Sequence, residues 1–111
     1  MNPVAASPVP LLEPETETET RLLPPYHVLI ENDDHHTMDF VIEVLRKVFG
    51  YDVPKSYSLM MHAHEKGEAI VWTGAKEVAE LKLEQILTFH QKHPVSGKEL
   101  GPLSCRIEAA A

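Results

Sequence analysis

The sequence predicts an α+β domain, a small two-layer sandwich in which three helices cover one face of a three-stranded antiparallel sheet. Three short apolar runs have the length of strands, and three longer stretches carry apolar side chains at helical spacing. Along the chain they follow the order β-α-α-β-α-β. Such elements bury their apolar faces by packing in two layers, which gives the predicted architecture.

The first strand and the first helix flank an acidic turn. Residues 26–31 are rich in apolar side chains and predict a strand, and residues 38–49 predict a helix. Thr37 is suited to cap the N-terminus of this helix, and Gly50 is suited to end it. The helix carries two apolar rows, Val41-Leu45-Val48 and Met38-Ile42-Leu45-Phe49.

The second helix and the second strand follow directly. A helix is predicted over residues 54–66, because Asp52-Val53-Pro54 places a proline at its start and Gly67 stands at its end. Residues 68–73 predict the second strand.

The last part of the chain holds one helix, one loop and one strand. Residues 75–92 predict a third helix with a broad apolar face. Residues 93–102 contain two prolines and two glycines and predict a loop. Residues 103–108 predict a short final strand.

Composition excludes several classes of protein. A chain of 111 residues suffices for one domain, and a formal net charge of −7 without a basic patch argues against nucleic-acid binding. No apolar run reaches the ~18 residues of a membrane span, and early prolines interrupt any secretory signal. The single cysteine, Cys105, excludes an internal disulfide framework. We expect a soluble, cytoplasmic, monomeric protein.

The N-terminal segment differs in composition from the rest. Six of the nine prolines fall within the first 25 residues, and residues 15–20 repeat Glu-Thr. A segment with so little apolar surface cannot offset its ordering entropy. We therefore expect residues 1–24 to be a disordered tail, either a solubilising device or an arm that a partner grips, and residues 25–111 to form the folded domain.

Asn32-Asp33-Asp34 is the most informative stretch of the chain, because it lies where the first strand turns toward the first helix. Two carboxylates and an amide at such a corner suit a small cation, above all an ammonium group. The alternative is a solvated turn with a helix cap, since Asn and Asp favour both.

The histidines invite a metal hypothesis, and the sequence gives it little support. Of the seven histidines, His62 and His64 lie two residues apart, and such residues point in different directions on a helix. A His-rich metal site using His35, His36, His62 and His64 remains an alternative that zinc titration would test. No nucleophile motif or phosphate loop is present, so we expect a binding protein without a cofactor rather than an enzyme.

Methionines at Met38, Met60 and Met61 are either core residues or an adaptable pocket wall. Methionine suits a pocket that accepts several large apolar side chains, because it is unbranched and polarisable.

Together these residues resemble the ClpS family, adaptors that deliver N-degron substrates to the Clp protease. The resemblance covers about residues 25–111. It rests on Tyr26-x-Val28-x-x-x-Asn32-Asp33-Asp34, Met38-x-Phe40-Val41-x-x-Val44-Leu45, Leu59-Met60-x-x-x-His64-x-x-Gly67-x-Ala69, Glu77-Val78-Ala79-Glu80-x-Lys82 and Pro102-Leu103-x-Cys105. It implies a small α/β sandwich similar to the C-terminal domain of ribosomal protein L7/L12.

The resemblance also implies roles for individual residues. Asn32, Asp33 and His64 match the positions that hold the free α-amino group of a substrate. The matching pocket takes Phe, Tyr, Trp or Leu, with the methionine at position 38 disfavouring Val and Ile, and a Clp AAA+ unfoldase of the ClpA or ClpC type docks at Glu77 and Lys82. The implied pocket is lined by Met38, Val41, Met60, Ala63 and Leu103, with Asp34, His36 and Thr37 at its rim.

Two departures from the family pattern stand out. His36-Thr37 replaces the usual Thr-Pro, which moves the capping hydroxyl by one residue and adds a titratable group whose protonation would oppose ammonium binding. The loop 93–102 is longer than usual, so the wall at Leu103 can be displaced. They motivate an alternative function, a ClpS-like paralogue that docks on the chaperone but has lost or altered N-degron recognition.

Overall fold

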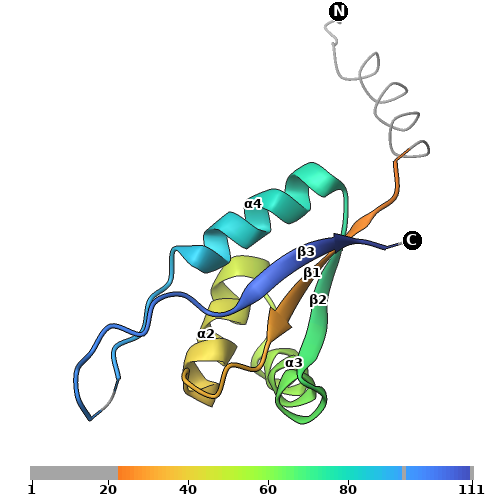
Figure 1. Ribbon diagram of the computed structural model, residues 1–111. Helices are drawn as coiled ribbons and strands as arrows, with labels where there is room; N and C mark the ends of the chain where they lie inside the picture. Colours follow the sequence, from red (N-terminus) through yellow and green to blue (C-terminus); the bar gives the residue numbers. More distant parts are fainter. Residues whose placement is uncertain (1–22, 94, 111) are drawn as a thin grey trace, which may run out of the picture.

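The computed structural model describes residues 23–93 and 95–110 and has the predicted α+β architecture (Figure 1). The predicted tail lies outside the described residues as far as residue 22. The elements are β1 (Tyr26–Glu31), α2 (Met38–Phe49), α3 (Val53–Lys66), β2 (Glu68–Gly74), α4 (Lys76–Leu87) and β3 (Cys105–Ala109).

The three strands form one antiparallel sheet in the order β2-β1-β3. The first strand in the sequence is therefore the central one, and Ile30 lies between Ala69 of β2 and Cys105 of β3. Since β1 leads directly into the acidic turn, the turn begins at the end of the central strand of the sheet. The register between β1 and β2 shifts once, between Val28 and Leu29.

One apolar core lies between the sheet and the helices. Alternate residues of a strand point to opposite faces, and Val28 and Ile30 of β1 both point to the helix side. All three helices contribute buried side chains to this core, which confirms the predicted two layers. The core residues from the helices are Val41, Val44, Leu45, Val48, Met60, Ala63, Ala79 and Ile86.

Local signals fix the ends of α2 and α3. The Thr37 hydroxyl accepts a hydrogen bond from the Phe40 N–H at 3.1 Å, and the Asp52 carboxylate accepts one from the Lys55 N–H at 2.9 Å. Gly50 and Gly67 end the two helices with positive φ angles of 74° and 94°, which glycine adopts without strain. The predicted bounds of these helices are correct to one residue.

The end of α4 was predicted wrongly. The helix ends at Leu87 rather than near residue 92, because the Thr88 hydroxyl donates to the Gln85 carbonyl at 2.7 Å and closes the last turn. The described residues that follow, 88–93 and 95–104, extend away from the body and lead back to β3 (Figure 1). Strand β3 begins at Cys105 rather than at residue 103.

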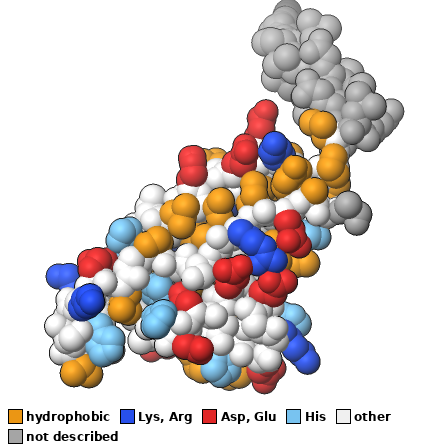
Figure 2. All heavy atoms as spheres, in the orientation of Figure 1, with side chains coloured by type: hydrophobic (Ala, Val, Ile, Leu, Met, Phe, Trp, Pro, Cys, Tyr) orange, Lys and Arg blue, Asp and Glu red, His pale blue; other side chains and the backbone are white. Residues whose placement is uncertain are grey.

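The sheet carries a charged cluster around Arg106 of β3. Its guanidinium contacts Glu31 of β1, Glu68 of β2 and Glu108 of its own strand. In Figure 2 a basic side chain flanked by acidic ones lies over the strands. In the described part of the chain, no helix is long and apolar enough to cross a membrane.

Candidate functional site

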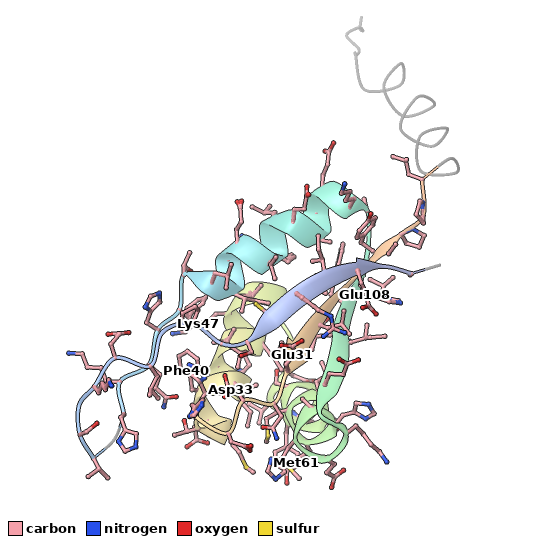
Figure 3. The ribbon with its side chains drawn as sticks, viewed as in Figure 1. Glu31, Asp33, Phe40, Lys47, Met61 and Glu108 are labelled. Carbon is pink, nitrogen blue, oxygen red and sulfur yellow. The ribbon has the colours of Figure 1, made fainter. Side chains whose placement is uncertain are left out.

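The acidic turn is held against the end of the sheet by its own backbone. The Asn32 N–H donates to the Gly67 carbonyl at 3.0 Å, which ties the turn to the start of β2. Asp34 adopts a positive φ of 59°, a conformation that aspartate tolerates better than most residues. Figure 3 shows the Asp33 side chain at this turn, close to Phe40 at the start of α2.

The Asp33 carboxylate accepts hydrogen bonds on both oxygens. Its Oδ1 atom accepts from the N–H groups of His35 at 3.0 Å and His36 at 3.2 Å. Its Oδ2 atom lies 2.7 Å from His36 Nδ1 and 3.4 Å from the Ser104 hydroxyl. Burial raises the pKa of Asp33, but the donors from His35 and His36 outweigh it and hold the pKa below its usual value.

His36 is enclosed by partners on three sides. Its side chain is 3% exposed, Nδ1 contacts Asp33 and Nε2 lies 3.0 Å from the Gly101 carbonyl. The ring stacks on Phe40 with centroids 5.0 Å apart. The histidine therefore joins the turn to the segment that precedes β3, whereas the sequence placed it only at the rim of the pocket.

A cavity of about 180 Å³ opens beside this turn. Its polar lining residues are Glu31 of β1, Asn32, Asp33, Asp34 and His36 of the turn, and His64 of α3. Its apolar end contains Ile30, Met38, Val41, Met60, Ala63 and Leu103. Every residue that the sequence assigned to the amine site and to the apolar pocket thus lines one cavity.

The apolar wall contains both buried residues and one exposed residue. Met60, Ala63 and Leu103 are buried, while Met38 is 44% exposed at the start of α2. Leu103 is only 3% exposed and is part of the wall, so the loop that precedes it does not displace it.

Thr37, which the sequence placed at the rim, does not line the cavity. Its hydroxyl caps α2 and accepts a hydrogen bond from Gln91 Nε2 at 2.8 Å, while its N–H donates to Gln91 Oε1 at 3.0 Å. Sequence reasoning missed Gln91, Gly101 and Ser104 as supports of the site. No local pattern identifies them, because their partners lie far away in the chain.

The remaining candidate residues lie apart from the cavity or apart from each other. His62 lines a separate groove between α3 and β2, which confirms that it and His64 point in different directions. Among the described residues, no three His, Cys, Asp or Glu side chains are arranged to hold a metal ion. Burial, and then the charge of Glu31, raise the pKa of the Cys105 thiol to about 11, which keeps it unreactive.

The two residues assigned to chaperone docking lie on α4. Glu77 is exposed in the first turn of this helix. Lys82 is half-buried, and its ammonium group donates to the Val48 carbonyl at the end of α2 at 3.0 Å.

Comparison with known proteins identifies the family. A family model described as ATP-dependent Clp protease adaptor protein ClpS matches residues 22–106. The chain is 38% identical over 102 residues to the ATP-dependent Clp protease adapter protein ClpS of Vibrio cholerae serotype O1, covering 90% of this chain and 88% of the relative. It is 40% identical over 98 residues to the protein of the same name from Aromatoleum aromaticum, covering 88% and 89%.

A solved structure supports the same relationship. The structure of Agrobacterium tumefaciens ClpS2 bound to L-phenylalaninamide matches with a TM-score of 0.63 and 30% identity, covering 78% of this chain and 96% of that one. The sequence, the order of the elements and the fold therefore agree, and the chain belongs to the ClpS family of adaptor proteins of the ATP-dependent Clp protease.

Proposed function

We propose that this protein binds substrate proteins by a free N-terminal residue with a bulky hydrophobic side chain and delivers them to a Clp AAA+ unfoldase of the ClpA or ClpC type. The observation that carries the proposal is one cavity that is lined both by the carboxylates of the acidic turn and by an apolar wall with two methionines. An N-terminal residue presents an ammonium group and a side chain on the same carbon atom. Such a cavity suits both groups at once.

The polar end suits an ammonium group rather than a neutral amide. Burial raises the pKa of Asp33, but the hydrogen bonds from His35 and His36 lower it by more. The pKa therefore lies below its usual value, and the carboxylate is ionised above acidic pH. Asn32 offers an amide oxygen, and its Nδ2 group already donates to Asp34 Oδ1 at 3.2 Å. His64 is exposed at the cavity, where its unprotonated ring nitrogen can accept a third hydrogen bond.

The cavity as a whole, with its polar and apolar lining together, is large enough for one large side chain. A cavity of about 150 Å³ lined by apolar groups holds benzene, and the cavity here is about 180 Å³. Met38 is the exposed residue of the apolar wall, and we place it beside the β-carbon of the substrate's first residue. A methionine there disfavours Val and Ile and leaves Phe, Tyr, Trp and Leu.

The docking face for the unfoldase is proposed on the exposed side of α4. Glu77 is exposed there, and Val78 and Leu81 leave 40% and 53% of their surface exposed. An acidic group beside exposed apolar side chains suits a protein interface. Lys82 borders this face while supporting the end of α2.

The test is a set of fluorescent peptides that differ only in their first residue. Peptides that begin with Leu, Phe, Tyr or Trp should bind, and those that begin with Val, Ile or Ala should bind weakly. An N-acetylated Phe peptide is the matched control, because it keeps the side chain and removes the charge. Equal affinity for the free and the acetylated peptides would disprove the proposal.

One observation favours a second candidate, an adaptor that docks on the chaperone without reading N-terminal residues. The His36 ring already occupies Asp33 Oδ2, the atom that an ammonium group would approach. If no peptide of the set binds while the protein still binds the unfoldase, the second candidate is the correct one.

A further inference from the structure

Both nitrogen atoms of the His36 ring face hydrogen-bond acceptors. Nδ1 lies 2.7 Å from the Asp33 carboxylate, and Nε2 lies 3.0 Å from the Gly101 carbonyl. Neither a carboxylate nor a carbonyl can donate. The ring therefore satisfies both contacts only when it carries a proton on each nitrogen, which makes it an imidazolium ion.

A neutral ring loses one of the two contacts. With its proton on Nδ1 it donates to Asp33 but directs a lone pair at Gly101, and with its proton on Nε2 the reverse holds. The tautomer with its proton on Nε2 suits a site in which another cation contacts the Asp33 carboxylate. The side chain is only 3% exposed, so water cannot readily replace the missing partner.

We propose that the imidazolium form of His36 and the α-ammonium group of the substrate compete for Asp33 Oδ2, so that peptide binding releases a proton from His36. This inference rests on the proposed function of the cavity. It makes His36 a positioning residue that acts through Asp33. It also predicts that affinity for a cationic N-terminus falls as the pH falls through the range in which imidazole titrates.

The groups around His36 set the sign of this effect. Asp33 is the acidic group in contact with the ring, and Gly101, Ser104 and Phe40 contribute no charge. Three further titratable groups share the cavity, namely Glu31 of β1, Asp34 of the turn and His64 of α3. His64 opposes ammonium binding in the same direction when protonated, so an experiment has to separate the two histidines.

Asp33 itself contributes little to the pH dependence in this range. Its pKa lies below the usual value, since the donors from His35 and His36 outweigh the effect of burial. The carboxylate is therefore charged throughout the range in which histidines titrate.

The experiment compares His36→Asn with the wild type and with His90→Asn. An asparagine amide reaches the position of Nδ1 and can donate to Asp33, but it cannot become a cation. His90 is the matched control, because it also pairs with a carboxylate, Glu99 at 3.2 Å, yet lies outside the cavity. Affinity for a peptide that begins with Phe is measured from about pH 5.5 to about pH 8.

We expect the wild type and His90→Asn to lose affinity on acidification by the same factor, up to about tenfold per pH unit for one linked proton. For His36→Asn the loss should be smaller by about threefold or more. Calorimetry in buffers of different ionisation enthalpy should show less proton release for this variant. His36→Gln, which reaches Gly101 instead, should give the same flattened profile if His36→Asn does not fold.

An unchanged pH profile and unchanged proton release in His36→Asn or His36→Gln would overturn the inference and assign the pH dependence to His64. Failure of the wild type to bind the peptide at any pH would instead overturn the proposed function, and the inference with it.

Discussion

Replacing Asp33 by asparagine separates the charge of the site from its architecture. Asp33 Oδ1 accepts hydrogen bonds from two backbone N–H groups, and the amide oxygen of an asparagine in the same place can accept both of them. The new amide nitrogen lies where Oδ2 contacted His36 Nδ1. A neutral His36 ring with its proton on Nε2 can accept from that nitrogen and still donate to Gly101. We therefore expect the fold to survive the loss of the charge.

The magnitudes follow from these contacts. Exchanging a charge-assisted hydrogen bond inside the protein for a neutral one should lower the free energy of unfolding by about 1 kcal/mol. A peptide loses the charge of the Asp33 carboxylate as a partner of its ammonium group, which is worth about 1.5–3 kcal/mol. The dissociation constant for a peptide that begins with Phe should therefore rise about 10- to 150-fold.

Fluorescence anisotropy with that peptide, beside thermal unfolding of the same sample, measures both effects. Asp39→Asn is the matched control, because Asp39 is an exposed acidic residue in the first turn of α2 that does not line the cavity. It removes the same charge from nearby and should change affinity by less than about threefold through long-range electrostatics. If both variants weaken binding equally, net charge rather than contact at Asp33 attracts the ligand, and the reasoning fails.

Three further outcomes are expected. Met38→Ala should admit peptides that begin with Val or Ile, because a smaller side chain in the pocket wall accepts a β-branched residue. An unchanged ranking in the anisotropy assay would show that Met38 does not set this preference. Lys82→Met should lower the free energy of unfolding in urea by about 1–2 kcal/mol by leaving the Val48 carbonyl without its ammonium donor, and an unchanged midpoint would contradict this. Deleting residues 1–22 should leave peptide affinity unchanged, because the cavity is lined by residues between Ile30 and Leu103. The same deletion should impair delivery in a degradation assay with an N-degron reporter. Full delivery would refute an active role for the segment.

The elements that the sequence predicted well are those whose ends depend on neighbouring residues. Thr37 and Gly50 cap α2 through contacts within one helical turn, and the predicted bounds of α2 agree with the structure. The end of α4 was predicted wrongly for the opposite reason. The apolar spacing continues past Leu87, but the Thr88 hydroxyl closes the last turn of the helix. In addition, the Gln91 side chain donates a hydrogen bond to Thr37, which lies 54 residues earlier. No local periodicity contains that information.

The same distinction applies to the cavity. Asn32 and Asp33 were identifiable because a carboxylate and an amide stand together directly after a strand. The partners of His36 were not, since Gly101 lies 65 residues away and contributes only a backbone carbonyl, which every residue possesses. A histidine in the sequence indicates a titratable group, and only the fold determines whether that group faces water, a metal ion or two acceptors.

His36 and Thr37, which directly precede α2, form one arrangement with the segment between α4 and β3. His36 contacts Gly101 and Thr37 contacts Gln91, so both residues hold the same segment between α4 and β3. Between these anchors the chain closes on itself, because Lys92 pairs with Glu99 and the Leu100 N–H donates to the Gln91 carbonyl at 2.8 Å. The other described residues of this segment project away from the body (Figure 1), while Leu103 stays in the cavity wall. A loop that is pinned at its base can change in length without moving the pocket, and changes at the anchors themselves act directly on Asp33 and on the start of α2.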